Sequence, residues 1–156
     1  MPNRIRSSTF KTKNNTDFPV EDFFNHVFES LHDYSIFTID TNLIINSWNS
    51  GVTTIFQYEP NEILQQHFDI IFTDEDKENG YPTIEIQTAL ESGKAIGNRW
   101  HIKKDGSKFY AQGQVFPVKS IDGEVIGFVK ILRDLTESKH TEEAINKYVS
   151  DLEDLV

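Results

Sequence analysis

Apolar side chains recur every three or four residues near both ends of the chain, which is the spacing of one helix face. Near the start this pattern predicts an amphipathic helix at residues 19–32. At the end it predicts a helix at residues 137–156, whose apolar side chains step by four, three and four residues as in a coiled-coil heptad. The expected helix–helix seam consists of Ile145, Val149, Leu152 and Val156.

Five segments between these helices alternate apolar and polar residues, the pattern of half-buried strands. The first two, residues 34–40 and 43–48, are joined by turn-forming residues and predict a β-hairpin. The other three, residues 94–103, 108–119 and 124–132, are joined by two turns that contain glycine. The pattern predicts an α+β fold in which five strands form one antiparallel sheet.

Short helical patterns occupy the stretch between the second and third of these strands. Residues 49–66 predict two short helices separated at Pro60, and residues 82–90 predict a third. The acidic segment 69–79 is predicted to be a loop. The apolar residues of the third helix are Ile84, Ile86, Ala89 and Leu90.

The composition excludes several classes of function. A net charge of −10 argues against a nucleic-acid-binding surface. The absence of cysteine excludes disulfides, thiolate zinc sites, iron–sulfur clusters and cysteine nucleophiles. Residues 1–18 are polar and basic, and we expect a disordered arm. Because no apolar run suits a signal peptide or a membrane span, we expect a cytoplasmic protein without membrane or nucleic-acid partners.

Five short motifs follow one another along the central part of the chain. They are Asp33–Phe37, Ile45–Asn49, Ile55–Tyr58 with Glu62-Ile63, Lys103–Phe109 and Gly127–Glu137. Together and in this order they resemble the PAS domain of bacterial sensor histidine kinases. The resemblance covers about residues 23–140 and implies the PAS fold, with short helices on one face of the sheet and the domain proper at residues 33–136. Gln57 stands where the family usually has glycine, and Gln65-Gln66 stands where a glycine often ends the short helix, so those turns either strain a non-glycine residue or take another shape.

The resemblance implies a ligand pocket between the inner face of the sheet and the helices. Aligned on the family motifs, strand alternation places the small residues Ala111 and Gly113 on one face with His101 and Lys130, two polar groups that would favour an anionic ligand. Alternatively, Lys130 reaches solvent at a strand edge or pairs with an acid. The pocket candidates are Phe37, Ile39, Phe56, Phe72, Ile86, His101, Phe109, Ala111, Gly113, Val115, Phe128, Lys130 and Leu132.

The same alignment places Trp100, Ile102 and Tyr110 on the opposite, outer face of the sheet. Apolar side chains on that face need a cover, and either the N-terminal helix or a second subunit would supply it.

The cofactors of PAS domains match this chain poorly. Flavin photosensing requires a reactive cysteine and amide side chains, and the amide positions fall on His101, Ala111 and Leu132. In haem-binding members of the family, a histidine of the inserted helix binds the haem. His67 is the histidine available for this role here, although a histidine at such a position is more often a surface or cap residue. The histidines show no metal-ligand spacing. Flavin, haem and metal are therefore disfavoured, and the cofactor stays unknown.

The resemblance implies a non-catalytic sensory or interaction module of bacterial signal transduction. Its expected partners are a second copy of the chain in a homodimer, a histidine kinase or another signalling protein, and a small-molecule ligand. Two alternatives stay open: a ligand-free dimerisation or adaptor module whose core is filled by phenylalanine rings, and a sensor fragment of a histidine kinase. No phosphate-binding loop or nucleophile elbow indicates an enzyme.

Four residues are expected to transmit the signal, namely Trp48, Asn49, Asp134 and Thr136. In the family the Asp-x-Thr pair resembles a latch that sets the angle of the exit helix. Here Asp134 would accept hydrogen bonds from neighbouring backbone or a basic side chain, and Thr136 would cap the last helix.

Overall fold

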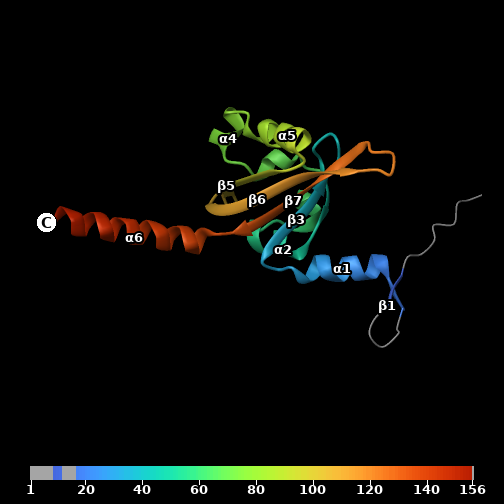
Figure 1. The fold of residues 1–156 in the computed structure, drawn as a ribbon, viewed down its shortest axis with the longest axis horizontal. Helices are drawn as coiled ribbons and strands as arrows, with labels where there is room; N and C mark the ends of the chain where they lie inside the picture. The colour runs from blue at the N-terminus through green and yellow to red at the C-terminus, as the bar shows by residue number, and fades with distance from the viewer. Residues whose placement is uncertain (1–8, 12–16, 156) are drawn as a thin grey trace, which may run out of the picture.

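Five strands form a single antiparallel sheet in the computed structural model, which describes residues 9–11 and 17–155 and the side chains of residues 22–155. The strand order across the sheet is β4-β3-β7-β6-β5, and every neighbouring pair is antiparallel. The strands are β3 (Tyr34–Ile39), β4 (Ile45–Trp48), β5 (Ala95–Ile102), β6 (Lys108–Lys119) and β7 (Val125–Asp134). This sheet confirms the predicted fold class, with β7 at its centre (Figure 1).

Short helices between β4 and β5 cover one face of the sheet. They contribute Val52, Phe56, Ile63, Phe68 and Ile86 to a core that they share with the inner faces of the strands. The hydrophobic core therefore lies between the sheet and the helices, as expected for the predicted α+β fold. The helices are α2 (Ser50–Phe56), α3 (Pro60–Ile63), the 3-10 helix η1 (Phe68–Ile71), α4 (Asp74–Glu78) and α5 (Tyr81–Ser92).

The prediction that residues 69–79 form a loop is wrong, because η1 and α4 occupy most of this segment. Helix α4 begins after Thr73, whose hydroxyl oxygen accepts a hydrogen bond from the backbone N–H of Asp76 at 3.3 Å. Three consecutive acids fill the first turn of α4, where they complement the positive end of the helix dipole. Local capping thus supplies a helix that hydrophobic periodicity does not reveal.

The apolar face predicted for α5 is only half correct. Ile86 and Ala89 are buried, whereas Ile84 and Leu90 each expose 49% of their surface. The buried side of α5 instead includes Glu85. The carboxylate of Glu85 therefore faces the core, whereas Ile84 and Leu90, which the pattern predicts on the buried side, face solvent.

Helix α1 (Val20–Ser30) lies within the predicted amphipathic segment but leaves much of its apolar face in solvent. Phe24 exposes 60% of its surface and Val27 exposes 38%, as does Leu31 directly after the helix. Before α1, residues 9–11 and 17–19 form a short antiparallel pair, β1 (Thr9–Lys11) with β2 (Asp17–Pro19), in the segment predicted as a disordered arm. The rest of that predicted arm lies outside the described residues.

Helix α6 (Thr136–Asp154) continues from β7 and runs away from the sheet (Figure 1). No residue of α6 is buried among those the structure describes. Within the same described ranges, no helix combines the length and apolar character needed to cross a bilayer.

Two turns show how the chain replaces glycines that are usual in the family. Gln57, the C-cap of α2, has φ of 68°, and Gln65 has φ of 72°. Both residues adopt the left-handed conformation, which costs a residue with a Cβ atom about 1–2 kcal/mol. The chain therefore keeps the turn shape and strains a non-glycine residue, the first of the two predicted outcomes.

Candidate functional site

The inner face of the sheet brings together all the side chains that alternation assigned to the pocket. Each of them is buried. Aromatic rings of the sheet and of the helical block meet edge to face there, with centroids 4.9 Å apart for Phe56 and Phe109 and 5.4 Å apart for Phe72 and Phe68, which was not among the predicted pocket residues. The rings therefore pack against one another across the space between the sheet and the helices.

A buried ion pair crosses this aromatic face. The Nζ atom of Lys130 on β7 donates a hydrogen bond to Oε1 of Glu85 on α5. Gly113 lies beside the pair: a Cβ atom at that position would be in ordinary contact with Lys130 Nζ at 3.5 Å and in a tight contact with Leu132 Cδ2 at 3.0 Å. Burial lowers the pKa of Lys130, and the Glu85 carboxylate opposes that shift. The structure shows that Lys130 pairs with an acid.

The ion pair leaves hydrogen-bonding capacity unused in the core. Glu85 Oε2 is buried and has no hydrogen-bond partner among the described residues. The Lys130 ammonium has three donors, and one of them is used by Glu85. An unpaired buried oxygen is costly, so the pair lowers the stability of the core relative to a fully satisfied one.

His101 on β5 is the second polar group of the predicted pocket and is also buried. Its Nδ1 atom lies 3.0 Å from the Ile71 carbonyl oxygen, so the neutral ring donates this hydrogen bond. The ring centroid lies 5.2 Å from that of Phe72 and 5.9 Å from that of Phe109. Burial, helped by the charge of Lys130, lowers the pKa of His101 to about 3. His101 is therefore neutral at physiological pH.

His67, considered as a stand-in haem ligand, lies outside this inner face. Its side chain is 43% exposed, and its Nδ1 atom accepts a hydrogen bond from the backbone N–H of Asp69 at 3.2 Å. His67 is thus the N-cap of η1, in agreement with the capping interpretation. No group of three or more potential ligands arranged for a metal ion occurs in the part of the chain that the structure describes.

Asn49 connects the sheet to the N-terminal helix. The side chain is fully buried, and its Oδ1 atom accepts a hydrogen bond from the Ile36 backbone N–H at 2.9 Å. Its Nδ2 atom donates to the carbonyl oxygens of Phe28 and Tyr34 at 3.1 Å and of Leu31 at 3.3 Å. One amide therefore holds the end of α1, the start of β3 and the start of α2 together.

The predicted latch lies where β7 passes into α6. Asp134 Oδ1 accepts hydrogen bonds from the backbone N–H of Thr136 at 2.9 Å and from its hydroxyl at 2.6 Å. The Thr136 hydroxyl oxygen in turn accepts from the Tyr110 N–H at 3.0 Å, and the Leu135 N–H donates to the Tyr110 carbonyl at 2.7 Å. Thr136 is therefore the first residue of α6 and a link to β6; the expectation that it caps the helix is wrong. Lys139 adds a contact from α6, with Nζ 5.0 Å from the Tyr110 ring centroid.

The predicted seam is a row of exposed side chains on α6. Ile145 exposes 57% of its surface, and Val149 and Leu152 expose 47% each. Val156 lies outside the described residues. These three side chains of the row are therefore in contact with solvent, and the seam stays a prediction.

Sequence analysis identified Trp48 as a candidate functional residue but did not identify Glu85. Trp48, half-buried in β4, donates from Nε1 to the Thr53 hydroxyl at 3.3 Å and was found through its family motif. Glu85 was missed, although it supplies the counter-charge for Lys130. The available signal was a lysine predicted to face an apolar core, which requires an acid nearby.

Comparison with known proteins identifies the family. A family model described as PAS domain matches residues 33–137. The chain belongs to the PAS domain family, in agreement with the motifs, the sheet order and the position of the helices.

Individual relatives agree with this assignment. Two-component system protein A of Emericella nidulans is 33% identical over 129 residues, which is 83% of this chain. The chain spans 19% of the length of that relative. The crystal structure of a PAS domain from Colwellia psychrerythraea superposes with a TM-score of 0.71 at 21% identity, covering 76% of this chain and 98% of that one. A domain of a sensory box sensor histidine kinase/response regulator from Geobacter sulfurreducens gives a TM-score of 0.61 at 16% identity, covering 74% and 94%.

Proposed function

We propose that this chain is a non-catalytic sensory input module of a two-component signalling protein and that it reports through α6 as a parallel pair with a second copy. Membership of the PAS family supports the sensory role, and the names of two relatives support the two-component setting. One observation carries the proposal: α6 leaves the central strand and exposes an apolar row.

The residue types of the row favour a second copy of α6 as its partner. In heptad terms Val149 occupies an a position, and Ile145 and Leu152 occupy d positions. Val149 with Leu152 is the combination of a β-branched residue at a and leucine at d that favours parallel two-stranded coiled coils, and Ile145 at d does not share this preference. An isolated helix of this length is marginal in water, so pairing would also stabilise α6.

Strand β7 offers a direct path from the inner face to α6. Lys130 and Asp134 lie on this same strand, Lys130 paired with α5 and Asp134 bonded to the start of α6. A rearrangement at the Glu85–Lys130 pair would shift β7 and change the crossing angle of the two α6 helices. Small shifts of packed helices are a common form of signalling transition.

The packed inner face favours a second candidate function, an adaptor that dimerises without a ligand. Lys130 already has a carboxylate partner, so an anionic ligand would have to displace Glu85. Native mass spectrometry of the purified chain distinguishes the two functions. A bound mass lost in Lys130→Met supports the ligand-binding sensor, whereas a dimer that carries no added mass supports the adaptor.

Cysteine cross-linking tests the parallel pair, because the chain has no cysteine of its own. Val149→Cys and Leu152→Cys should each form disulfide-linked dimers under mild oxidation. The matched controls Ser150→Cys and Asp151→Cys lie on the same helix at b and c positions and should cross-link at least ten times more slowly. Equal rates at all four positions would refute the seam.

A further inference from the structure

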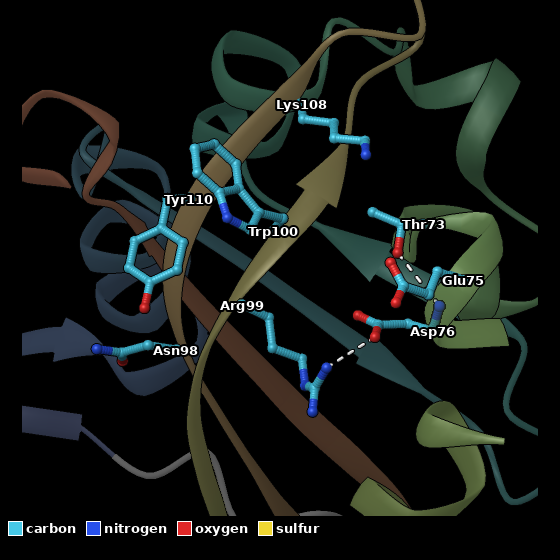
Figure 2. Close-up of a pocket in the computed structure, with 8 residues that line it drawn as sticks. All are labelled: Thr73, Glu75, Asp76, Asn98, Arg99, Trp100, Lys108 and Tyr110. Carbon is cyan, nitrogen blue, oxygen red and sulfur yellow. Dashed lines mark hydrogen bonds and ion pairs between the residues drawn. The ribbon is translucent and has the colours of Figure 1, made fainter. Parts of the chain in front are cut away.

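A pocket of about 400 Å³ lies at the edge of the sheet, away from the inner face. Strand β5 is an edge strand, and helix α4 stands beside it. Figure 2 shows Trp100 and Tyr110 on the strand side of this pocket and Glu75 and Asp76 on the α4 side. We call it the edge pocket.

Two of the four charged groups in the edge pocket neutralise each other. Arg99 donates from a terminal nitrogen to Asp76 Oδ1 at 2.8 Å. The guanidinium carbon also lies 2.9 Å from the centre of the Tyr81 ring, so the group is held against that ring. Arg99 and Asp76 therefore form part of the pocket wall and carry no net charge toward a ligand.

The other two charges have no ion-pair partner among the described residues. They are the Glu75 carboxylate and the Lys108 ammonium, and both are exposed. They come from opposite sides of the pocket, and Figure 2 shows the Lys108 side chain reaching toward the α4 side. The pocket thus presents one anion and one cation together.

An aromatic surface lies next to these two charges. Trp100 and Tyr110 are directly paired across β5 and β6, with ring centroids 5.2 Å apart and planes at 58°. Both are half-buried and line the pocket, and the Lys139 ammonium lies 5.0 Å from the Tyr110 ring centroid, which leaves Trp100 as the ring available to a ligand. Such rings bind flat or apolar groups and also attract a cation placed over a ring face.

We propose that the edge pocket binds a zwitterionic amino acid with a flat or apolar side chain. Its ammonium group would pair with Glu75, its carboxylate with Lys108, and its side chain would pack on Trp100. A pocket with one anion, one cation and an aromatic surface is complementary to a molecule that carries a cation, an anion and a flat or apolar group. The binding site stands independently of the function proposed above.

The edge pocket is also next to the start of α6. Tyr110, which lines the pocket, bonds through its backbone to Leu135 and Thr136. A ligand bound in the pocket could therefore affect the start of α6 through Tyr110 alone. This consequence, unlike the binding itself, rests on the proposed relay through α6.

L-Phenylalanine is a suitable probe, and two derivatives of it test the two charges separately. N-acetyl-L-phenylalanine lacks the ammonium group, and L-phenylalanine methyl ester lacks the carboxylate. We would titrate the full chain with each compound and follow the two tryptophan indole N–H signals by NMR, assigned with Trp100→Phe. The zwitterion should shift the Trp100 signal in a saturable way and bind at least ten times more tightly than either derivative.

Variants then assign each charge to its partner. Lys108→Gln should remove the preference for the free carboxylate and keep the preference for the free amine. Glu75→Gln should do the reverse, and Lys119→Gln, an exposed lysine elsewhere on β6, should change neither.

Three results would overturn the site: no saturable shift at Trp100, equal affinity for all three compounds, or shifts confined to the surroundings of Lys130. Saturable binding at Trp100 with unchanged amide signals at residues 136–139 would support the site and count against the relay.

Discussion

The inner face of the sheet and helix α6 differ in opposite ways from the usual distribution of residues, because the inner face buries charged side chains and α6 exposes apolar ones. The inner face encloses a lysine and a glutamate among aromatic rings, with Lys130 only 1% exposed. Helix α6 has no buried residue among those described and displays Leu152 and its neighbours in the row to solvent. Strand β7 belongs to both regions. Under the function proposed above, the folding free energy resides in the first region, and the second acquires its contacts from another molecule.

The largest effect should come from removing one member of the buried ion pair. Glu85→Ala leaves the Lys130 charge buried without its partner, which should lower the free energy of unfolding by about 3–5 kcal/mol. Urea denaturation followed by tryptophan fluorescence measures this change.

Two further variants separate the charge effect from general damage to α5. Glu91→Ala, at an exposed position of the same helix, should change stability by less than about 0.5 kcal/mol. The double variant Glu85→Leu with Lys130→Met should recover most of the loss, because it removes both charges together. A double variant as unstable as Glu85→Ala would contradict this assignment.

The next effect concerns pH and His101. Its pKa in the folded chain is about 3, below its ordinary value of 6.5, so the unfolded chain binds the extra proton between these values. Stability contributed by neutral His101 is therefore present above pH 6.5 and is lost as the pH falls. From pH 7 to pH 5 the loss should be about 2 kcal/mol.

The control for this pH effect is His101→Asn, whose amide can still donate to the Ile71 carbonyl but does not titrate. Its stability should fall less steeply between pH 6.5 and pH 5, where most carboxylates remain ionised. Identical slopes for the two proteins in denaturation experiments would show that His101 is not the responsible group.

A smaller effect is expected at the junction between the two regions. Asp134→Ala removes the two hydrogen bonds to Thr136 and should cost about 1 kcal/mol, as for other side chains that bond the first turn of a helix. Hydrogen exchange should accelerate at residues 136–139 and stay unchanged in β7. Asp151→Ala, exposed in the middle of α6, serves as the control, and an equal acceleration there would argue against a latch.

The smallest effect on the monomer should come from the apolar row. Leu152→Ala removes an exposed side chain, so the unfolding free energy of the dilute monomer should change by less than about 0.5 kcal/mol. The same change should abolish dimerisation in sedimentation equilibrium at high protein concentration. A large loss of monomer stability would mean that α6 packs against its own domain.

Alternation along the strands predicted the inner face correctly, because the pleated backbone sends successive side chains to opposite sides. That rule places Phe109, Ala111, Gly113 and Val115 on one face, the alignment on the family motifs identifies it as the inner face, and all four are buried. The exposed row on α6 likewise follows from helical spacing.

The polar partners could not be predicted in the same way, because they depend on contacts between distant segments. Glu85 lies 45 residues before Lys130, and a single glutamate in a helix usually faces solvent. Helix α4 is too short for periodicity to reveal and is fixed by the Thr73 cap and by Arg99, 23 residues away from Asp76. The bonds from Asn49 to α1 also required the folded structure.

Hydrogen–deuterium exchange at several protein concentrations tests the contrast most directly. We predict that the amides of residues 141–155 exchange quickly in dilute solution and become protected as concentration rises, while β6 and β7 stay equally protected throughout. Protection of α6 that is already complete in dilute solution, or that never develops, would contradict the account.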